Sequence, residues 1–423
     1  LLEMKQITTK ICKDHIFTAC ISAAPLEQEN RVSFHVYSAS DSNTTIGESA
    51  ANYTIEEDIL PNYPLTLIIH GFTGNYLTKS STIIRDALLY KGLKNIVSVD
   101  WESLASIPNA SPTVSYYQIV EDNVPLVADE VASWLKSLNE RGVIDYSEVH
   151  IIGFSLGAQI AGLVGLQLEG ELGRITALDP PKIGYAEKPI EHKLDSTDAR
   201  FVFVIHTSGG FISFAEPCGH VDFYPNGGSP PQPECPMDDM IHSMACSHYM
   251  AYKIFTESIY NEFAFNASKC ENWSSFKENK CNSNEYALMG YITSNKTRGN
   301  FYYKTNLKPP FGLTVNGKTL PNSVITQMMY SEEDRRDVTS SFSDSEKDEK
   351  DQNIAEISSE TNAARDKYNI EENNIMRVKS KHHSLTSTTS TPLVKQVNSS
   401  HRSYHSYLLV VISCIFSIRY FRL

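Results

Sequence analysis

The chain has little positive charge and no long apolar run. Its 423 residues hold 50 acidic side chains against 37 lysines and arginines, a formal net charge of -13. Nucleic-acid binding needs a basic surface for the phosphates, so this balance argues against a nucleic-acid partner. The apolar run near the C-terminus, Tyr407 to Ile418, is too short to cross a bilayer as a helix. With 41% hydrophobic residues, the chain can still bury a large core.

The sequence starts at Leu1, without an initiator methionine and without the charged and apolar regions of a signal peptide. We therefore expect that a signal peptide has been removed or was not captured. Eight cysteines occur together with seven glycosylation sequons, and the combination favours the secretory pathway and an extracellular location. The sequons begin at Asn43, Asn52, Asn109, Asn266, Asn272, Asn295 and Asn398.

One stretch combines a strand, a sharp turn and a helix. In residues 149–169, an apolar run ends in Gly153-Phe154-Ser155-Leu156-Gly157, and small and apolar residues follow at helical spacing. This pattern is typical of a nucleophile elbow. A Cβ at either glycine would collide with the tight turn, and the helix N-terminus offers backbone N–H groups to a developing oxyanion. Ser155 is therefore predicted to be a nucleophile.

Further apolar runs alternate with helical patterns along the chain. Runs that are apolar on both faces indicate buried parallel strands, and helical periodicity marks residues 124–138. The alternation predicts an α/β fold with a mostly parallel central sheet and helices on both faces. We expect strands at residues 32–37, 65–69, 96–99, 149–152, 174–179 and 201–206.

This topology locates an acid but leaves the base open. Asp179 ends the strand that follows the elbow helix, so right-handed crossovers place it beside Ser155 at the carboxyl edge of the sheet. Hydrolases of this kind take their base from a histidine further along the chain. Chain order does not choose among the candidates His206, His220, His242 and His248, the last of which precedes a helical pattern at residues 249–259.

The chain carries, in order, the blocks LTLIIHGFTGN, VDW, VHIIGFSLGAQIAG, GRITALDP, LDSTDARFVFVIHT, GHVDFYPNGG and CSHYMAY. Together they resemble the pancreatic lipase family over roughly residues 32–313, which implies an α/β-hydrolase fold. The resemblance implies that Ser155 is the nucleophile, Asp179 the orienting acid and His248 the base. It also implies an oxyanion hole made by the backbone N–H groups of Phe72 and Leu156. His206 and His220 then become structural.

The resemblance further implies a structural calcium ion near Asp195 and Asp198, whose hard oxygen ligands suit that cation. No cofactor is expected for the reaction itself. The chain departs from the family where Phe154 and Gln159 replace two histidines of the elbow region. Neither position belongs to the triad, so we expect altered local hydrogen bonding and not a loss of activity.

The cysteines divide into expected pairs and unassigned ones. The resemblance implies the disulfides Cys235–Cys246 and Cys270–Cys281. Each would close a loop of about a dozen residues and contribute roughly 3 kcal/mol in the chain-entropy model. The remaining cysteines are Cys12 and Cys20, which are close enough for a small loop disulfide, and Cys218 and Cys414, which have no assigned partner.

Loop lengths bear on the substrate. In the family's triacylglycerol lipases a long disulfide-closed lid covers the site, whereas residues 236–245 and 208–219 form short loops here. Short loops resemble the phospholipase A1 members of arthropod type, so we expect a secreted lipid carboxylic-ester hydrolase that cuts glycerophospholipids at sn-1. The lipid, at a membrane or micelle surface, is the expected partner. The alternatives are a triacylglycerol or galactolipid lipase and, from another class, a non-catalytic lipid-binding homologue of yolk type.

The resemblance stops at residue 313, so we expect a catalytic domain over residues 1–313. An acidic stretch and then a Ser/Thr-rich, basic one predict a disordered stalk over residues 314–406. Residues 407–423 form a hydrophobic tail. With small residues at 398–400, this tail is either a removable lipid-anchor signal or a translated end of no function.

Overall fold

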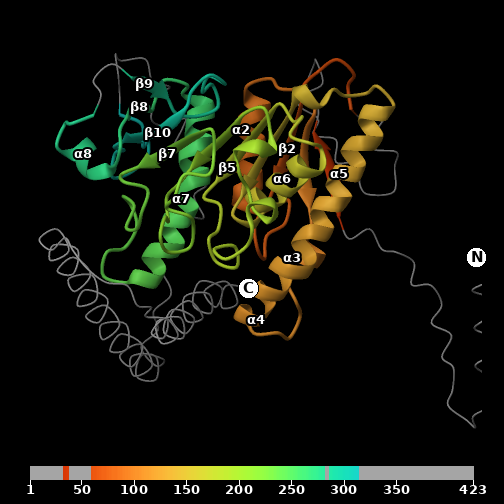
Figure 1. Ribbon diagram of the computed structural model, residues 1–423, viewed down its shortest axis with the longest axis horizontal. Helices are drawn as coiled ribbons and strands as arrows, with labels where there is room; N and C mark the ends of the chain where they lie inside the picture. The colour runs from red at the N-terminus through yellow and green to blue at the C-terminus, as the bar shows by residue number, and fades with distance from the viewer. Residues whose placement is uncertain (1–31, 38–58, 282–284, 314–423) are drawn as a thin grey trace, which may run out of the picture.

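The structure, a computed structural model, describes residues 32–37, 59–281 and 285–313 (Figure 1). Within these ranges no helix combines the length and the apolar character needed to cross a membrane. Several expectations fall outside the ranges: the stalk, the hydrophobic tail, Cys12, Cys20, Cys414, and the sequons at Asn43, Asn52 and Asn398.

A single sheet runs through the described residues, and most of its strands are parallel. The order is β1-β3-β2-β4-β5-β6-β7-β10-β8-β9, and neighbours from β3 to β10 run parallel, with antiparallel pairs only at the two ends. The predicted α/β architecture is therefore confirmed. The strands are β1 (Ser33–Tyr37), β2 (Leu65–Ile69), β3 (Ile96–Asp100), β4 (Val149–Phe154), β5 (Arg174–Leu178), β6 (Val202–Ile205), β7 (Val221–Pro225), β8 (Asn266–Lys269), β9 (Tyr286–Leu288) and β10 (Gly299–Tyr303).

Helices cover both faces of this sheet, as predicted. Every residue of β2 is buried, and alternate side chains enter different cores: Leu67 packs with helices α5 and α6, whereas Ile68 packs with α2 and α7. A strand covered on both faces must be apolar throughout, which is why these segments read as continuous apolar runs. The covering helices are α2 (Lys79–Tyr90), α5 (Val124–Glu140), α6 (Leu156–Gln167) and α7 (Met240–Tyr260).

The shorter helices lie mainly in the connections. They are α3 (Glu102–Ala105), α4 (Pro112–Gln118) and α8 (Trp273–Lys277), the π-helical turn η2 (Ile119–Asn123), and the 3-10 turns η3 (Tyr146–Glu148), η4 (Ile190–His192) and η5 (Ser196–Asp198). Figure 1 shows α4 and the start of α7 at the same end of the molecule.

Helix α7 is longer than the sequence pattern predicts. The helix expected at residues 249–259 begins at Met240, because the Asp239 side chain accepts hydrogen bonds from the N–H groups of Ile241 (3.0 Å) and His242 (3.1 Å). An aspartate in this position is a strong N-cap. His248 therefore lies inside the helix and does not precede it, so its backbone position is fixed by the helical hydrogen bonds.

Candidate active site

The turn at Ser155 has the geometry of a nucleophile elbow. Ser155 connects β4 to α6 with φ 55° and ψ -123°, a conformation that is strained for a residue with a side chain. A Cβ on Gly153 would lie 2.3 Å from the carbonyl oxygen of Gly157, and a Cβ on Gly157 would lie 2.1 Å from that of Ile69. Only glycine fits at either position, so the close packing of strand and helix depends on the pattern that the sequence contains.

Asp179 follows the neighbouring strand β5 and is completely buried. Strands β4 and β5 are paired so that Phe154 lies opposite Leu178, and the N–H of Ser155 donates to the carbonyl of Leu178 (3.0 Å). Asp179 is a second non-glycine residue with positive φ, at 53°. The predicted placement of the acid beside the serine, at one edge of the sheet, is what the strand register produces.

Three donors hold one oxygen of the Asp179 carboxylate. Its Oδ1 accepts from the N–H groups of Thr207 (2.7 Å) and Ser208 (3.0 Å) and from the hydroxyl of Ser213 (2.7 Å). Hydrogen bonds to the charged form stabilise a buried carboxylate. Sequence reasoning missed these donors. The only available signal was the position of Thr207 and Ser208 just after the strand that ends at Ile205, and nothing in the sequence pointed to Ser213.

His248 contacts the other oxygen of this carboxylate. Its Nδ1 lies 2.6 Å from Oδ2 of Asp179, and the imidazole is almost fully buried. An ionised carboxylate only accepts, so Nδ1 carries the proton and Nε2 is left as the basic nitrogen. The ring of Phe154, the residue before Ser155, lies 4.7 Å from the imidazole between ring centroids. The predicted triad residues thus converge on the carboxyl ends of β4 and β5.

The chain after β2 passes next to the nucleophile. A Cβ on Gly71 would lie 2.9 Å from Cβ and 3.4 Å from Oγ of Ser155. Phe72 follows Gly71 directly and packs edge-on against Tyr116 at 5.2 Å. Leu156 is the first residue of α6. Leu156 thus follows the serine directly, and Phe72 follows the glycine that passes next to it.

The other candidate histidines have partners unrelated to Ser155. His206 pairs with Asp222, and Nδ1 of His220 accepts from the N–H of Val202 at 3.0 Å. His242 is exposed and pairs with Asp239. Among the four histidines that chain order left open, only His248 contacts Asp179 in the described part of the chain.

Comparison with known proteins agrees with this geometry. The family model described as Lipase matches residues 11–311, which is most of the chain. The chain belongs to the lipase family. Its pancreatic-lipase-like blocks and its α/β-hydrolase architecture are what that membership requires.

Three curated relatives illustrate the similarity of this lipase-family chain. It is 38% identical over 221 residues to phospholipase A1 member A of Rattus norvegicus, covering 51% of this chain and 46% of the relative. It is 34% identical over 245 residues to lipase member H of Rattus norvegicus, with coverages of 57% and 51%. It is 32% identical over 298 residues to pancreatic triacylglycerol lipase of Cavia porcellus, covering 62% of each chain. The chain thus spans about half the length of the curated relatives it matches.

Two substitutions noted in the sequence have clear places in this lipase-family site. Phe154 packs its ring on His248 and on Tyr252, whose centroid lies 5.1 Å away. The amide of Gln159 donates to the carbonyl of Pro181 (3.1 Å) and accepts from the N–H of Leu194 (2.9 Å). Gln159 therefore links the segment after Asp179 to the segment that carries Asp195.

Asp195 and Asp198 form a reciprocal cap on the turn η5. The side chain of Asp195 accepts from the N–H of Thr197, and Oδ2 of Asp198 accepts from the N–H of Asp195 at 2.8 Å. The pKa of Asp198 is raised to about 8, mainly because the side chain is buried; the hydrogen bond from the N–H of Asp195 lowers this pKa, whereas the Asp195 carboxylate raises it. Among the described residues no cationic side chain offsets this. Asp198 is buried and Asp195 is partly buried, and carboxylates of this kind are hard oxygen ligands that fit a calcium ion in their chemistry.

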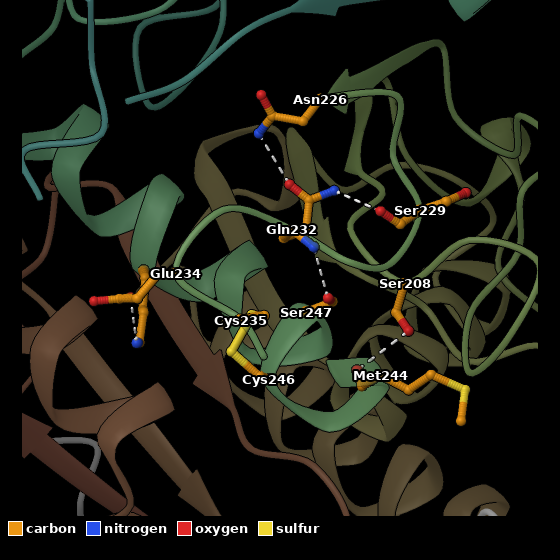
Figure 2. Close-up of a disulfide and its surroundings, with 10 residues drawn as sticks. Ser208, Asn226, Ser229, Gln232, Glu234, Cys235, Met244, Cys246 and Ser247 are labelled. Carbon is orange, nitrogen blue, oxygen red and sulfur yellow. Dashed lines mark hydrogen bonds and ion pairs between the residues drawn. A yellow bond between two sulfur atoms is a disulfide. The ribbon is translucent and has the colours of Figure 1, made fainter. Parts of the chain in front are cut away.

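Disulfides lie on both sides of α7. Cys235 is bonded to Cys246 with Cα atoms 5.6 Å apart, and Cys270 to Cys281 with Cα atoms 4.8 Å apart. Figure 2 shows the first of these, with the N–H of Gln232 donating to the Ser247 hydroxyl at 3.0 Å. The segment before Cys235 is therefore tied to the turn of α7 that carries His248.

Cys218 is the free cysteine of the described residues. Burial raises the pKa of its thiol well above the ordinary value, and nearby carboxylates, of which Asp222 acts most strongly, raise it further. A thiol in such surroundings is a poor nucleophile.

Proposed function

We propose that this chain hydrolyses carboxylic esters of lipids with a Ser155-Asp179-His248 triad. Nε2 of His248 removes the Ser155 proton as Oγ attacks the acyl carbonyl. Asp179 fixes the imidazole tautomer and stabilises the imidazolium that forms. The N–H groups of Phe72 and Leu156 stabilise the tetrahedral oxyanion, and water then releases the fatty acid from the acyl-enzyme.

One observation supports this proposal above all: the 2.6 Å contact between Nδ1 of His248 and Oδ2 of Asp179. A buried carboxylate that is aimed at an imidazole by three further donors is costly to build for packing alone. The strained backbone of Ser155 points the same way, because such strain collects at functional sites.

We propose glycerophospholipid cut at sn-1 as the substrate. The relative with 38% identity is named a phospholipase A1, and the disulfide between Cys235 and Cys246 encloses a short segment, half of which is the first part of α7. A short cover leaves room for a bulky polar headgroup. The pancreatic triacylglycerol lipase among the relatives keeps triacylglycerol as the alternative.

The proposed partner is a lipid surface, met by a secreted protein. Met237 is 86% exposed and Met240 40% exposed at the start of α7, and Val114 of α4 is 59% exposed. Figure 1 places α4 and the start of α7 at the same end of the molecule. Flexible apolar side chains at this end suit insertion between lipids, because exposed apolar groups gain free energy when they leave water. We propose no nucleic-acid partner, no catalytic cofactor and a structural calcium ion at Asp195 and Asp198.

The test uses purified protein on three substrates: phospholipid labelled at sn-1, phospholipid labelled at sn-2, and triacylglycerol. We expect release of the sn-1 label and little release of the sn-2 label. Turnover of triacylglycerol alone would refute the substrate assignment while leaving the ester hydrolase intact. A galactolipid is added as a fourth substrate, because its turnover alone would identify a galactolipid lipase.

A covalent serine-hydrolase probe tests the chemistry without a substrate. We expect the probe to label the unmutated protein and Ser155→Ala to abolish this labelling. Ser213→Ala should only slow the labelling, since the Ser213 hydroxyl donates a hydrogen bond to Asp179. Labelling of the Ser155→Ala variant would rule out the proposed nucleophile. No labelling of the unmutated protein would favour the non-catalytic lipid-binding class.

A further inference from the structure

A second group of ligand side chains lies beside the segment that holds Asp179. His206 follows β6, Asp222 belongs to β7, and Cys218 lies in the connection between them. One possible ligand atom from each residue lies within 4.8 Å of the other two. In the part of the chain that the structure describes, this is the one such group of three or more His, Cys, Asp and Glu residues.

The imidazole of His206 is oriented as a metal ligand would be. Its Nδ1 donates to the carbonyl of Phe214 (2.8 Å), so Nε2 faces Oδ1 of Asp222, also at 2.8 Å. The ring stacks on Tyr224 with centroids 4.5 Å apart, which fixes its plane. Histidines that bind metals donate their other ring N–H to a carbonyl or carboxylate in the same way.

Cys218 supplies a thiol that no other residue in the described part of the chain is bonded to. It is unpaired in the described residues although the fold contains two disulfides, and the residue as a whole is only partly buried. The carboxylates of Asp222, Asp195 and Glu216 act on it electrostatically. This negative surrounding attracts a cation to the thiol.

We propose that His206, Cys218 and Asp222 bind one thiophilic divalent cation of the zinc class. Imidazole, thiolate and carboxylate are the three side-chain ligands of zinc, and a water molecule completes the tetrahedron. The soft thiolate separates this site from the hard-oxygen pair that suits calcium. The proposal does not depend on the hydrolase activity.

Binding requires small adjustments and releases protons. Zinc bond lengths of about 2.0–2.3 Å place tetrahedral donor atoms roughly 3.3–3.7 Å apart. The hydrogen bond between His206 and Asp222 must open slightly, and the Cys218 side chain must turn inward. The ion takes the place of the protons on Sγ of Cys218 and Nε2 of His206, which pass to water.

A bound ion would stabilise the connection after β6, which holds the Asp179 carboxylate. Thr207 and Ser208, whose N–H groups hold Oδ1 of Asp179, follow His206 directly. An ion shared by residues 206, 218 and 222 cross-links both ends of this connection. We expect zinc to raise the thermal stability of the protein as the logarithm of its concentration above the dissociation constant.

The experiment titrates the full chain, stripped of metal with a chelator, with Co²⁺ and then Zn²⁺. We expect one Co²⁺ per chain with a thiolate-to-cobalt charge-transfer band, displaced by an equal amount of Zn²⁺. Cys218→Ala should abolish the band and weaken zinc binding by more than about 100-fold, a larger loss than outer partners of a metal cause. The matched control replaces Cys12 and Cys20 by alanine and should keep both band and affinity.

Three results would overturn the proposal. They are zinc affinity unchanged in Cys218→Ala, absence of the charge-transfer band in the unmutated chain, and a thiol assay that finds Cys218 in a disulfide with Cys12, Cys20 or Cys414. Because Cys218 is partly exposed, its alanine variant should fold, and circular dichroism checks this. These measurements need no enzymatic turnover, so their outcome is independent of the hydrolase assignment.

Discussion

Phe154 is the residue of the elbow whose ring packs against His248, the proposed base. Its ring lies 4.7 Å from the imidazole of His248 and is nearly buried. An aromatic face favours the imidazolium that forms as Ser155 attacks. We expect Phe154→Leu to lower kcat roughly tenfold, equivalent to about 1.4 kcal/mol, with KM unchanged. Steady-state kinetics on the preferred phospholipid measure both constants.

The matched control is Phe154→Tyr, which keeps the aromatic ring and should restore most of kcat. If the leucine and tyrosine variants lose activity equally, the ring acts through packing alone. A rise in KM with kcat unchanged would place Phe154 against the lipid and contradict its position behind the base.

At the scale of elements, α7 depends on its cap because it carries the base. Asp239 accepts from two N–H groups at the start of the helix, so Asp239→Ala should cost about 1 kcal/mol in the free energy of unfolding. The neighbouring Asp238 is exposed and makes a matched control. Asp238→Ala removes the same charge near the helix N-terminus but no cap, and we expect a loss below about 0.5 kcal/mol. Urea unfolding measures the difference, and equal losses would show that only charge matters.

The same helix shows where sequence patterns were sufficient and where they were not. Strands such as β2 and β4 were predictable because nearly all of their residues are buried and most of them are apolar. The start of α7 was missed because a cysteine pair and an exposed methionine interrupt the apolar pattern, whereas the Asp239 cap decides it locally. Strand β10 was not predicted at all, since its parallel pairing with β7 depends on tertiary structure.

The candidate site divides in the same manner. Ser155 and Asp179 follow from a local turn and from strand order, but His248 needed a family resemblance because four histidines satisfied the order equally. The three hydrogen-bond donors to Oδ1 of Asp179 could not be predicted as a set, because Ser213 comes from a loop whose path no local pattern specifies.

For the whole molecule, the buried Asp198 makes stability depend on pH and on calcium. Its pKa is about 8 in the folded protein, against an ordinary value of 3.8. Between these values the folded state keeps a proton that the unfolded state has released, so the free energy of unfolding falls as pH rises from about 4 to 8. With a chelator present, Asp198→Asn should remove this slope. At pH 8 it should make the protein more stable than the unmutated chain by on the order of 1–3 kcal/mol.

With calcium present, we expect the unmutated chain to be more stable at pH 8 than Asp198→Asn. A bound cation favours the ionised carboxylate and supplies the positive charge that the buried Asp198 otherwise lacks nearby. The unmutated chain should then gain stability at pH 8 with increasing calcium, whereas Asp198→Asn should gain little. Thermal unfolding of both proteins at pH 5 and 8, with calcium or with chelator, separates the two effects. If the pH dependence of stability persists in Asp198→Asn, a titratable group other than Asp198 causes it. If the unmutated chain shows a steep pH dependence of stability with chelator and calcium leaves it unchanged, the buried Asp198 would be supported and the calcium site refuted. Stability would then respond to the proton alone.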